Sequence, residues 1–324
     1  MGVSAQPVKV GVWGLGRHAR RRILPAIARC PSTLLTGVTT RDQNVSRDEA
    51  ARYECQSWPT PTAMLNDCDL DAVYVSTPTG LHAPHGMMVL RAGKHLWCEK
   101  PLCATLPEAQ QLSRTARNND LALCEGLMYL YHPHFSAVRR IVSDPAFGHV
   151  LSIRSQFGLP PLEQPGFRLD PVLGGGALLD LAPYPLSAVL ELVDQPLDVI
   201  ASNIEGQNGC DVDISGFALL STADQTTRAY LEWGYERAYR NHLSVWGEHG
   251  SLLTDFIFSK ADEYRPSVYL RDKRGGVEVI RIDPADSFHS MFVAFTEVVL
   301  DGTIRERHRE AIETRAGYLD RLGA

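Results

Sequence analysis

The sequence is poor in the features that mark several large classes of protein. It has seven cysteines, an odd number at scattered positions without a Cys-x-x-Cys pair. This pattern argues against a disulfide framework or a cysteine zinc site and favours reduced, cytoplasmic thiols. No run of about 18 apolar residues occurs, so we expect no membrane-spanning helix. The N-terminus lacks a basic stretch followed by a long apolar one, so we expect no secretory signal.

An excess of positive charge is also missing. The 324 residues carry a formal net charge of −6, which argues against a nucleic-acid or membrane-surface partner, since both favour a basic face. The close histidine pairs His82/His85 and His132/His134 have no third ligand at a usable spacing, so we expect no metal. Apolar residues make up 44% and charged residues 22% of the chain, as in an ordinary globular protein.

The length suggests two domains. In the first third, short apolar runs alternate with helical patterns, which predicts an α/β domain with a parallel, doubly wound sheet. The expected strands are residues 8–13, 34–39, 72–76, 95–98 and 121–124, and the expected helices are residues 17–28, 82–92 and 106–119.

After Glu125 the pattern changes, because strands follow one another with turns between them. This predicts an α+β domain with a mostly antiparallel sheet. The expected strands are residues 150–158, 198–206, 214–221, 226–233, 242–246 and 268–271, and the expected helices are residues 134–143, 177–193, 288–300 and 309–322. We place the domain boundary near Cys124, and the last two helices could pack on either domain.

The strongest chemical signal follows the first strand. Gly14, Gly16 and Ala19 fit the G-x-G-x-x-[G/A] pattern where the first strand meets the first helix. The first glycine permits the tight turn, the second lets the backbone approach a pyrophosphate, and the small third residue lets the helix pack close to the strand. The helix N-terminus then faces the phosphates with unpaired N–H groups. This segment predicts a dinucleotide-binding site.

The end of the second strand bears on the choice between NAD and NADP. An NAD site places an acidic residue there, which binds the ribose 2′-hydroxyl. Here the slot holds Thr40, followed by Arg41, and a hydroxyl beside a guanidinium suits a 2′-phosphate. Asp42 would supply the acid if the strand ended one or two residues later. We therefore predict NADP(H), with NAD as the alternative.

Other residues are placed around the same edge of the sheet. Thr77 and Pro78 follow the third strand and His82 begins a helix, so they are expected to line the nicotinamide pocket, because ligands bind beyond the carboxyl ends of such strands. The alternative for His82 is a helix-start residue without a ligand. Arg17 reaches the adenine or a phosphate, or else belongs to a solvated helix face.

Lys100 is a catalytic candidate at this edge. It follows the strand at 95–98 in the segment Glu99-Lys100-Pro101, so its side chain can point into the cleft. A cis Pro101 would turn the chain sharply there. Without further context, Lys100 is better interpreted as a surface charge.

The second catalytic candidate lies in the second domain. Three glycines at 174–176 precede Asp180 and Tyr184, which are four residues apart and would share one helix face. A phenol and a carboxylate at the end of a glycine-rich loop could bind a carbonyl and a sugar hydroxyl. The alternative is a first-turn aspartate and an ordinary packed tyrosine.

These segments together resemble the glucose–fructose oxidoreductase/inositol dehydrogenase/MocA family over nearly the whole chain. The resemblance rests on Gly14-Leu15-Gly16, Ser76-Thr77-Pro78 with His82, Ala92-Gly93-Lys94-His95, Glu99-Lys100-Pro101 and the segment 174–184. It implies an NADP-binding Rossmann domain at residues 1–124. It also implies a substrate-binding and oligomerisation domain at residues 125–324, with a large open sheet and homodimers or homotetramers. The lysine of Glu-Lys-Pro is catalytic or substrate-orienting in this family.

Many members carry a histidine four residues after the aspartate, whereas this chain has Tyr184. That departure resembles the nucleotide-sugar 3-ketoreductases of deoxysugar pathways, and also the dimeric dihydrodiol dehydrogenases and related aldose dehydrogenases. The segments 21–26, 128–133 and 157–161 favour the ketoreductases. The resemblance implies NADPH-dependent reduction of a keto group, expected at C3, on a nucleotide-linked keto-deoxysugar. Tyr184 would donate the proton, Lys100 would assist, and Asp180 would help bind the substrate.

Two other functions stay open. One is an NADP-dependent dehydrogenase of a free aldose or a trans-dihydrodiol, and the other is a non-catalytic regulator that senses a dinucleotide. Retention of Lys100 and Tyr184 speaks against the regulator. The residues that we expect to contact the cofactor are Gly14, Leu15, Gly16, Arg17, His18, Thr40, Arg41, Thr77, Pro78, His82, Glu99, Lys100, Arg168 and Asp180.

Overall fold

The computed structural model describes residues 6–206 and 211–323, and its contacts divide the chain into two compact units. The first unit runs to Leu127 and takes in Phe288–Ala316, whereas the second comprises Met128–Ser287 and the chain from Gly317. The change of unit after Leu127 lies three residues beyond the expected boundary. The chain returns to the first unit near its end, so the second unit is shorter than residues 125–324.

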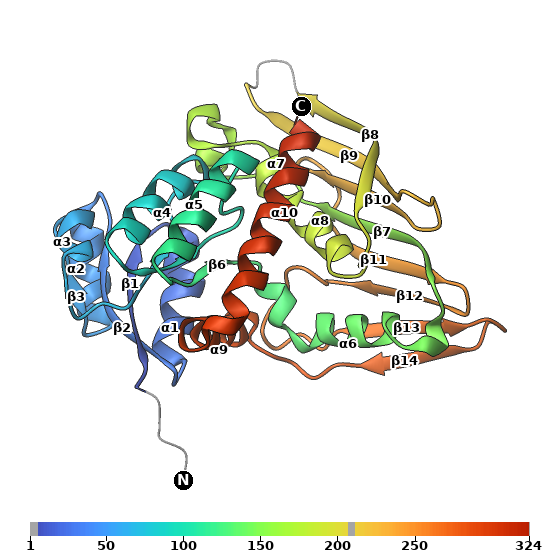
Figure 1. Cartoon of the computed structure of the whole chain (residues 1–324), viewed down its shortest axis with the longest axis horizontal. Coiled ribbons are helices and arrows are strands. Elements are labelled where there is room, and N and C mark those ends of the chain that lie inside the picture. Colours follow the sequence, from blue (N-terminus) through green and yellow to red (C-terminus); the bar gives the residue numbers. More distant parts are fainter. Residues whose placement is uncertain (1–5, 207–210, 324) are drawn as a thin grey trace, which may run out of the picture. The chain divides into compact units, whose positions relative to one another are not determined.

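The first unit contains a six-stranded parallel sheet in the order β3-β2-β1-β4-β5-β6 (Figure 1). Its strands are β1 Val8–Trp13, β2 Thr33–Thr39, β3 Gln56–Ser57, β4 Ala72–Val75, β5 His95–Cys98 and β6 Leu123–Glu125. The order reverses between β1 and β4, and at such a switch point the carboxyl ends of the strands border a crevice for ligands. The α/β class and the parallel sheet are confirmed.

Helices connect these strands. They are α1 Leu24–Arg29, α2 Gln43–Arg52, α3 Pro61–Leu65, α4 His82–Arg91 and α5 Leu106–Asn118. The helix expected at residues 17–28 is not uniform, because a π-helical turn at Ala19–Ile23 precedes α1. The start of α5 is fixed by a capping box in which Thr105 and Glu108 bind each other's backbone N–H groups, which satisfies donors that the first helical turn leaves unpaired.

The helix α9, Ser287–Leu300, completes the core of the first unit. Its Phe292 ring lies 5.5 Å from the ring of Tyr74, and its Phe295 ring lies 5.6 Å from that of Trp97. All four aromatic side chains are fully buried. Burial of such large apolar groups explains why the chain returns to the Rossmann sheet after forming the second unit.

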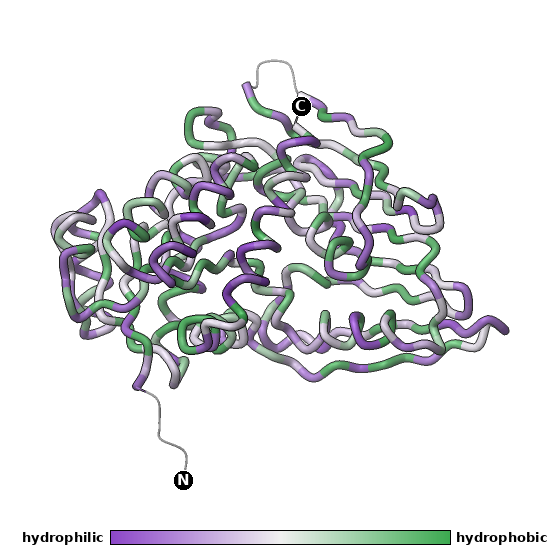
Figure 2. Tube along the Cα trace, in the orientation of Figure 1, coloured by the Kyte–Doolittle hydropathy of each residue, from purple (hydrophilic) through white to green (hydrophobic). Residues whose placement is uncertain are grey.

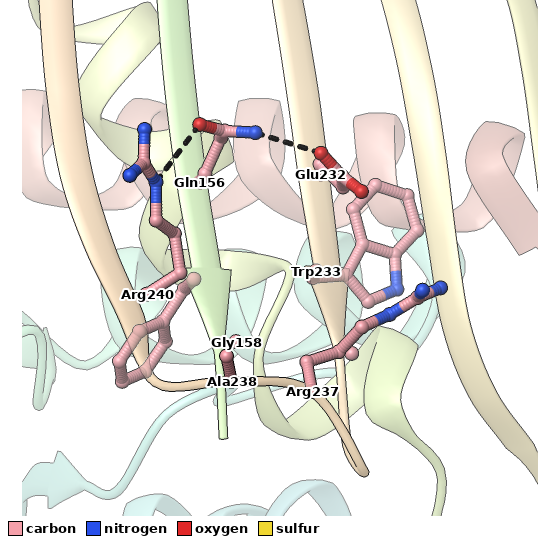
Figure 3. A pocket seen from close by; sticks show the side chains of 9 residues that line it. Gln156, Gly158, Glu232, Trp233, Arg237, Ala238 and Arg240 are labelled. Carbon is pink, nitrogen blue, oxygen red and sulfur yellow. Dashed lines mark hydrogen bonds between the residues drawn. The ribbon is translucent and has the colours of Figure 1, made fainter. Parts of the chain in front are cut away.

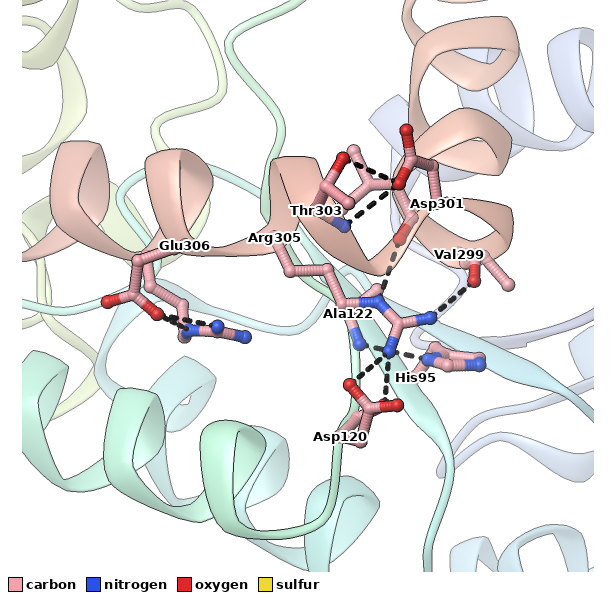
Figure 4. Close-up of polar contacts among 10 residues, drawn as sticks. His95, Asp120, Ala122, Val299, Asp301, Thr303, Arg305 and Glu306 are labelled. Atoms are coloured by element: carbon pink, nitrogen blue, oxygen red, sulfur yellow. Dashed lines mark hydrogen bonds and ion pairs between the residues drawn. The ribbon is translucent and has the colours of Figure 1, made fainter.

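Arg305 fixes the turn from α9 into α10, Arg305–Gly323. Its guanidinium donates to the carbonyls of Val298 and Val299 at the end of α9, at 3.0 and 2.5 Å, and to the Asp120 carboxylate at 2.6 Å (Figure 4). These carbonyls have no partner inside their own helix. One buried arginine therefore caps α9 and ties the start of α10 to the Rossmann domain.

The second unit contains an eight-stranded sheet in the order β14-β13-β12-β11-β7-β10-β9-β8. Neighbouring strands are antiparallel except β7 and β10, which are parallel. The strands are β7 Val150–Gly158, β8 Leu197–Gly206, β9 Asp213–Thr222, β10 Arg228–Gly234, β11 Arg240–Gly247, β12 Gly250–Asp255, β13 Ser267–Asp272 and β14 Val277–Arg281. The mostly antiparallel sheet is confirmed.

Three helices belong to the second unit: α6 Pro133–Val142, α7 Ala177–Asp180 and α8 Pro183–Leu190. Helix α8 contacts β7 and β10. Hydrophilic and hydrophobic residues follow one another along the strands (Figure 2). Among the described residues, no single helix is long and apolar enough to cross a membrane, although Pro171–Asp180 with Pro183–Leu190 passes that test as a bent pair.

Candidate active site

The turn after β1 has the backbone that a dinucleotide site needs. Gly14 has a φ of +102°, and a Cβ there would lie 2.6 Å from the carbonyl oxygen of Ser76. A Cβ on Gly16 would meet nothing within 4 Å. Residue 14 must therefore be glycine for the fold, whereas the space beside Gly16 suits a pyrophosphate. The helix begins at Arg17, directly after Gly16, and its first intrahelical bond runs from the Arg20 N–H to the Gly16 carbonyl at 3.1 Å, so the N–H groups of its first turn suit an anion.

The end of β2 explains the role of its acidic residue. The strand ends at Thr39, and Asp42 is the N-cap of α2, where its carboxylate accepts from the N–H groups of Asn44 and Val45 at 2.9 and 3.4 Å. Asp42 is thus used for capping, and Thr40 and Arg41 are the residues that directly follow β2. Arg41 is exposed, as a residue facing a phosphate must be before binding.

Glu99 links two segments of the cofactor edge. One oxygen of its carboxylate lies 3.0 Å from His18 Nε2 and accepts from the Tyr74 hydroxyl at 2.6 Å. Burial would raise the pKa of Glu99, but the imidazole, the phenol and the nearby Lys100 together lower it to about 2. The structure thus brings His18 and Glu99 together beside the glycine turn, which the sequence pattern did not indicate.

His82 differs from the expectation that it lines the nicotinamide pocket. It is buried, and its ring nitrogens lie 2.7 Å from the Pro101 carbonyl oxygen and 2.8 Å from that of Thr77. Burial lowers the pKa of His82, while the two carbonyls act in the opposite direction. Both nitrogens face the backbone, so His82 ties the end of β4 to the loop after β5 and presents no polar atom to a ligand.

The other residues expected at this edge stay on or near the surface. Arg17 is exposed on the first helical turn, and Pro78 is partly exposed after β4. The Thr77 hydroxyl lies 3.1 Å from His85 Nδ1. Lys100 is partly buried directly after β5, and its peptide bond to Pro101 is cis, as the sequence suggested.

In the second unit, the glycine-rich loop has a specific partner. Gly176 has a φ of +113°, and a Cβ there would overlap the Asp213 carboxylate. That carboxylate accepts from the Leu178 N–H at 2.6 Å, and burial raises its pKa. Asp213, at the start of β9, therefore caps α7 from outside, and the glycine leaves room for it.

The argument that Asp180 and Tyr184 share one helix face is wrong. Asp180 ends α7 and Tyr184 lies in α8, and the helical segments on either side of the break meet at a bend of 48°. Pro183 accounts for the break, because proline lacks the N–H that a continuous helix needs and clashes with the preceding turn.

Asp180 is held by two side chains. Its Oδ2 accepts from Arg168 Nε at 2.7 Å and from the Tyr235 hydroxyl at 2.9 Å. Burial and the neighbouring Asp180 carboxylate raise the pKa of Tyr235, so it stays a donor. Arg168, which we expected to contact the cofactor, pairs with Asp180 in the second unit. Tyr235 was missed, because 55 residues separate it from Asp180 and no motif marks it.

The Tyr184 ring is enclosed by aromatic side chains. It packs against Phe157 at 5.0 Å, Phe258 at 5.7 Å and Tyr129 at 6.1 Å between ring centroids. Its hydroxyl lies 3.9 Å from the sulfur of Met128, a weak acceptor. These contacts fix the orientation of the ring and therefore the direction of its hydroxyl.

A hollow of about 290 Å³ lies on the eight-stranded sheet. Figure 3 shows its polar row, in which Gln156 accepts from Arg240 at 3.2 Å and donates to Glu232 at 2.7 Å. Successive side chains of a strand point to opposite faces, so Gln156 faces away from Phe157 and its neighbour Tyr184. Phe157, whose ring packs against Tyr184, is among the residues that line the hollow, whereas Tyr184 itself is not.

Within residues 6–206 and 211–323, no group of three His, Cys, Asp or Glu side chains could hold a metal ion. The groups available for chemistry are a glycine turn at a helix start and a lysine at the same sheet edge in the first unit, and in the second unit a phenol enclosed by aromatic rings and a carboxylate held by two donors. A Rossmann sheet with such a turn, followed by an antiparallel α+β unit, defines the two-domain dinucleotide-dependent oxidoreductases as a class.

Comparison with known proteins gives the family. Residues 8–127 match the model of an oxidoreductase family with an NAD-binding Rossmann fold, and residues 135–253 match the GFO/IDH/MocA C-terminal domain. The chain belongs to the GFO/IDH/MocA family of oxidoreductases, which confirms the resemblance noted in the sequence.

Several relatives match over nearly their full length. A dTDP-3,4-didehydro-2,6-dideoxy-α-D-glucose 3-reductase of Actinomadura kijaniata is 33% identical, with 99% of this chain and 97% of the relative covered. An enzyme of the same name from Streptomyces violaceoruber is 35% identical over 91% and 86% of the two chains. The crystal structure of KijD10, a 3-ketoreductase from A. kijaniata in complex with NADP and TDP-benzene, is 32% identical with a TM-score of 0.93, covering 98% of this chain and 97% of the other.

Proposed function

We propose that this chain uses NADPH to reduce the C3 keto group of a dTDP-linked keto-deoxysugar. The observation that carries the proposal is the 33% identity with a dTDP-keto-deoxyglucose 3-reductase over 99% of the chain. The match runs through both compact units, so it includes the glycine turn and the helix that carries Tyr184. A likeness confined to the Rossmann unit would support a cofactor but no substrate.

The first unit supplies the cofactor site in this proposal. The turn from Gly14 to Gly16 and the helix start after it would hold the pyrophosphate, and Thr40 with Arg41 would hold the 2′-phosphate. The open space beside Gly16 and the use of Asp42 as an N-cap support both assignments. When bound, the nicotinamide supplies the hydride that reduces the ketone.

The second unit supplies the proton. Tyr184 would donate its phenolic proton from Oη to the carbonyl oxygen of the substrate, which becomes the hydroxyl of the product. Lys100 would place its ammonium beside the same oxygen and stabilise the negative charge that develops there. A positioned general acid contributes roughly 10²–10⁴-fold to rate, and a fixed charge at the oxygen contributes a comparable factor.

Asp180 would bind a substrate hydroxyl or the nicotinamide ribose. Arg168 Nε and the Tyr235 hydroxyl both donate to its Oδ2 and fix the carboxylate. Binding of a ligand therefore loses little conformational entropy of this side chain. The chain would act as a homodimer or homotetramer through its large sheet.

The test is product analysis with labelled cofactor. A dTDP-linked 3-keto-deoxysugar, generated in the reaction vessel, is offered together with NADPH deuterated at the transferring position. We expect loss of NADPH absorbance and deuterium at C3 of the sugar by NMR. Oxidation of a free aldose or trans-dihydrodiol with NADP⁺, without reduction of the keto-sugar, would instead favour the dehydrogenase function. Tight NADPH binding without any turnover would favour the regulator.

A further inference from the structure

The loop that carries Lys100 is tied to the rest of the first unit by a buried carboxylate. Glu125, the last residue of β6, accepts at Oε1 from the backbone N–H of Leu102 at 2.9 Å. Leu102 is fully buried and lies two residues after Lys100. Only Pro101, whose carbonyl oxygen lies against His82, separates Leu102 from Lys100. Glu125 therefore fixes the backbone from which the Lys100 side chain extends.

The carboxylate is itself held by one arginine. Arg315 Nε donates to Glu125 Oε2 at 2.6 Å, and the two side chains are 10% and 4% exposed. A buried ion pair adds little stability compared with apolar side chains of the same volume, but loss of one partner leaves a charge uncompensated. A gain in stability therefore does not explain this buried ion pair. The need for an acceptor that binds the Leu102 N–H does explain it.

Arg315 is in turn placed by the anchored helix α10. Arg305, at the first turn of this helix, binds Asp120 and the last carbonyls of α9 (Figure 4). Arg315 lies ten residues later, roughly 15 Å along a helix that rises 1.5 Å per residue. A regular helix with its start fixed also fixes the direction in which Arg315 points.

We propose that Glu125 and Arg315 are positioning residues for Lys100. Glu125 holds the backbone of the Glu99–Leu102 loop, and Arg315 keeps the carboxylate aimed at Leu102. This inference rests on the proposed role of Lys100 in the reduction. Neither Glu125 nor Arg315 needs to touch the substrate, because the effect passes through the loop.

The first test measures the loop directly and needs no substrate. Glu125→Gln replaces the carboxylate with a weaker acceptor whose NH₂ opposes the donors of Arg315, and Arg315→Gln removes the partner. We expect amide hydrogen exchange at Leu102 to become at least about tenfold faster in both variants, since the hydrogen bond protects this N–H. Arg309→Gln is the matched control, because Arg309 is also buried on α10 but pairs with Glu306 on the same helix. Unchanged exchange at Leu102 in the folded variants would overturn the proposal.

The second test is a double-mutant cycle on turnover. We expect Glu125→Gln to lower kcat about tenfold or more while KM for NADPH stays within about twofold, and Arg315→Lys to retain most of the activity. In a Lys100→Ala background, Glu125→Gln should have almost no further effect, because residues that act as a unit are not additive. An equal loss in both backgrounds would show that Glu125 does not act through Lys100. Full activity of Lys100→Ala itself would refute the proposed function of the lysine, a different result from normal activity of Glu125→Gln.

Discussion

The substitution Tyr184→Phe separates the proton donor from everything else that this side chain does. Phenylalanine keeps the ring and hence the contacts with Phe157, Phe258 and Tyr129. The substitution removes the hydroxyl, whose contact with the Met128 sulfur at 3.9 Å is weak. We expect the free energy of unfolding to fall by about 1 kcal/mol, the usual net contribution of one hydrogen bond.

Turnover should respond much more strongly. Loss of a general acid costs at least about a hundredfold, which corresponds to roughly 2.7 kcal/mol of transition-state stabilisation. The assay is the initial rate of NADPH oxidation with the keto-sugar, together with a fluorescence titration of NADPH. We expect kcat to fall by about 10²–10⁴ while the Kd of NADPH stays within about threefold.

A matched control excludes a general effect of removing a buried phenol hydroxyl. Tyr318 is buried in the same unit, and its hydroxyl binds the backbone N–H and carbonyl of Leu197 at 2.9 and 2.7 Å. Tyr318→Phe should cost about 1–3 kcal/mol of stability and leave kcat nearly unchanged. If Tyr184→Phe keeps kcat within about threefold of the wild type, Tyr184 is not the acid, since a lost proton donor costs far more.

The first unit yields three further predictions. Gly16→Ala should leave the melting temperature unchanged but weaken NADPH binding at least about tenfold, because its Cβ enters open space where a pyrophosphate approaches. Gly14→Ala should cost more than about 1 kcal/mol of stability, since the φ of residue 14 is +102° and that conformation penalises a side chain. Equal melting temperatures of the two variants would refute this distinction. Arg41→Ala should raise the Kd of NADPH about tenfold, the effect of losing one charge-assisted hydrogen bond, and leave that of NADH unchanged; equal losses for both cofactors would contradict the NADP assignment. The pKa of Glu99 is lowered from 4.5 to about 2 in the folded state, so Glu99 stabilises the fold fully above about pH 4.5. This contribution is at most about 3 kcal/mol and is lost as the pH falls toward 2. Urea unfolding between about pH 5 and 3 should show a shallower pH dependence in Glu99→Gln, and an identical slope would speak against the bonds to His18 and Tyr74.

The sequence predicted the elements that build the two cores, because their periodicity reflects burial. The strands β1, β5 and β7 begin and end at the expected residues. Strand β12 was missed because one of its buried residues, Thr254, is polar and interrupts the apolar pattern. Its hydroxyl is satisfied by hydrogen bonds with His134 at 2.7 Å and the Ser267 carbonyl at 2.8 Å. Strand β14 was missed because it lies at the sheet edge and is mostly exposed, so no apolar alternation marks it.

The site was predictable only where backbone geometry demands a residue type. Gly14 and Gly176 are visible in the sequence because positive φ angles and close neighbours exclude other residues. The contacts that hold the functional groups are not visible. Glu125 and Arg315 are 190 residues apart, and neither belongs to a motif. Long-range polar pairs of this kind depend on the complete fold, which local patterns do not encode.

The central claim is that Lys100 and Tyr184 act on one carbonyl oxygen. A crystal structure of the ternary complex with NADP⁺ and a dTDP-linked sugar tests it most directly. The account predicts that Lys100 Nζ and Tyr184 Oη both lie about 3 Å from the oxygen on C3 of the sugar, within reach of a proton transfer. A productive complex in which the two atoms approach different oxygens, or lie on opposite sides of the sugar, would contradict it.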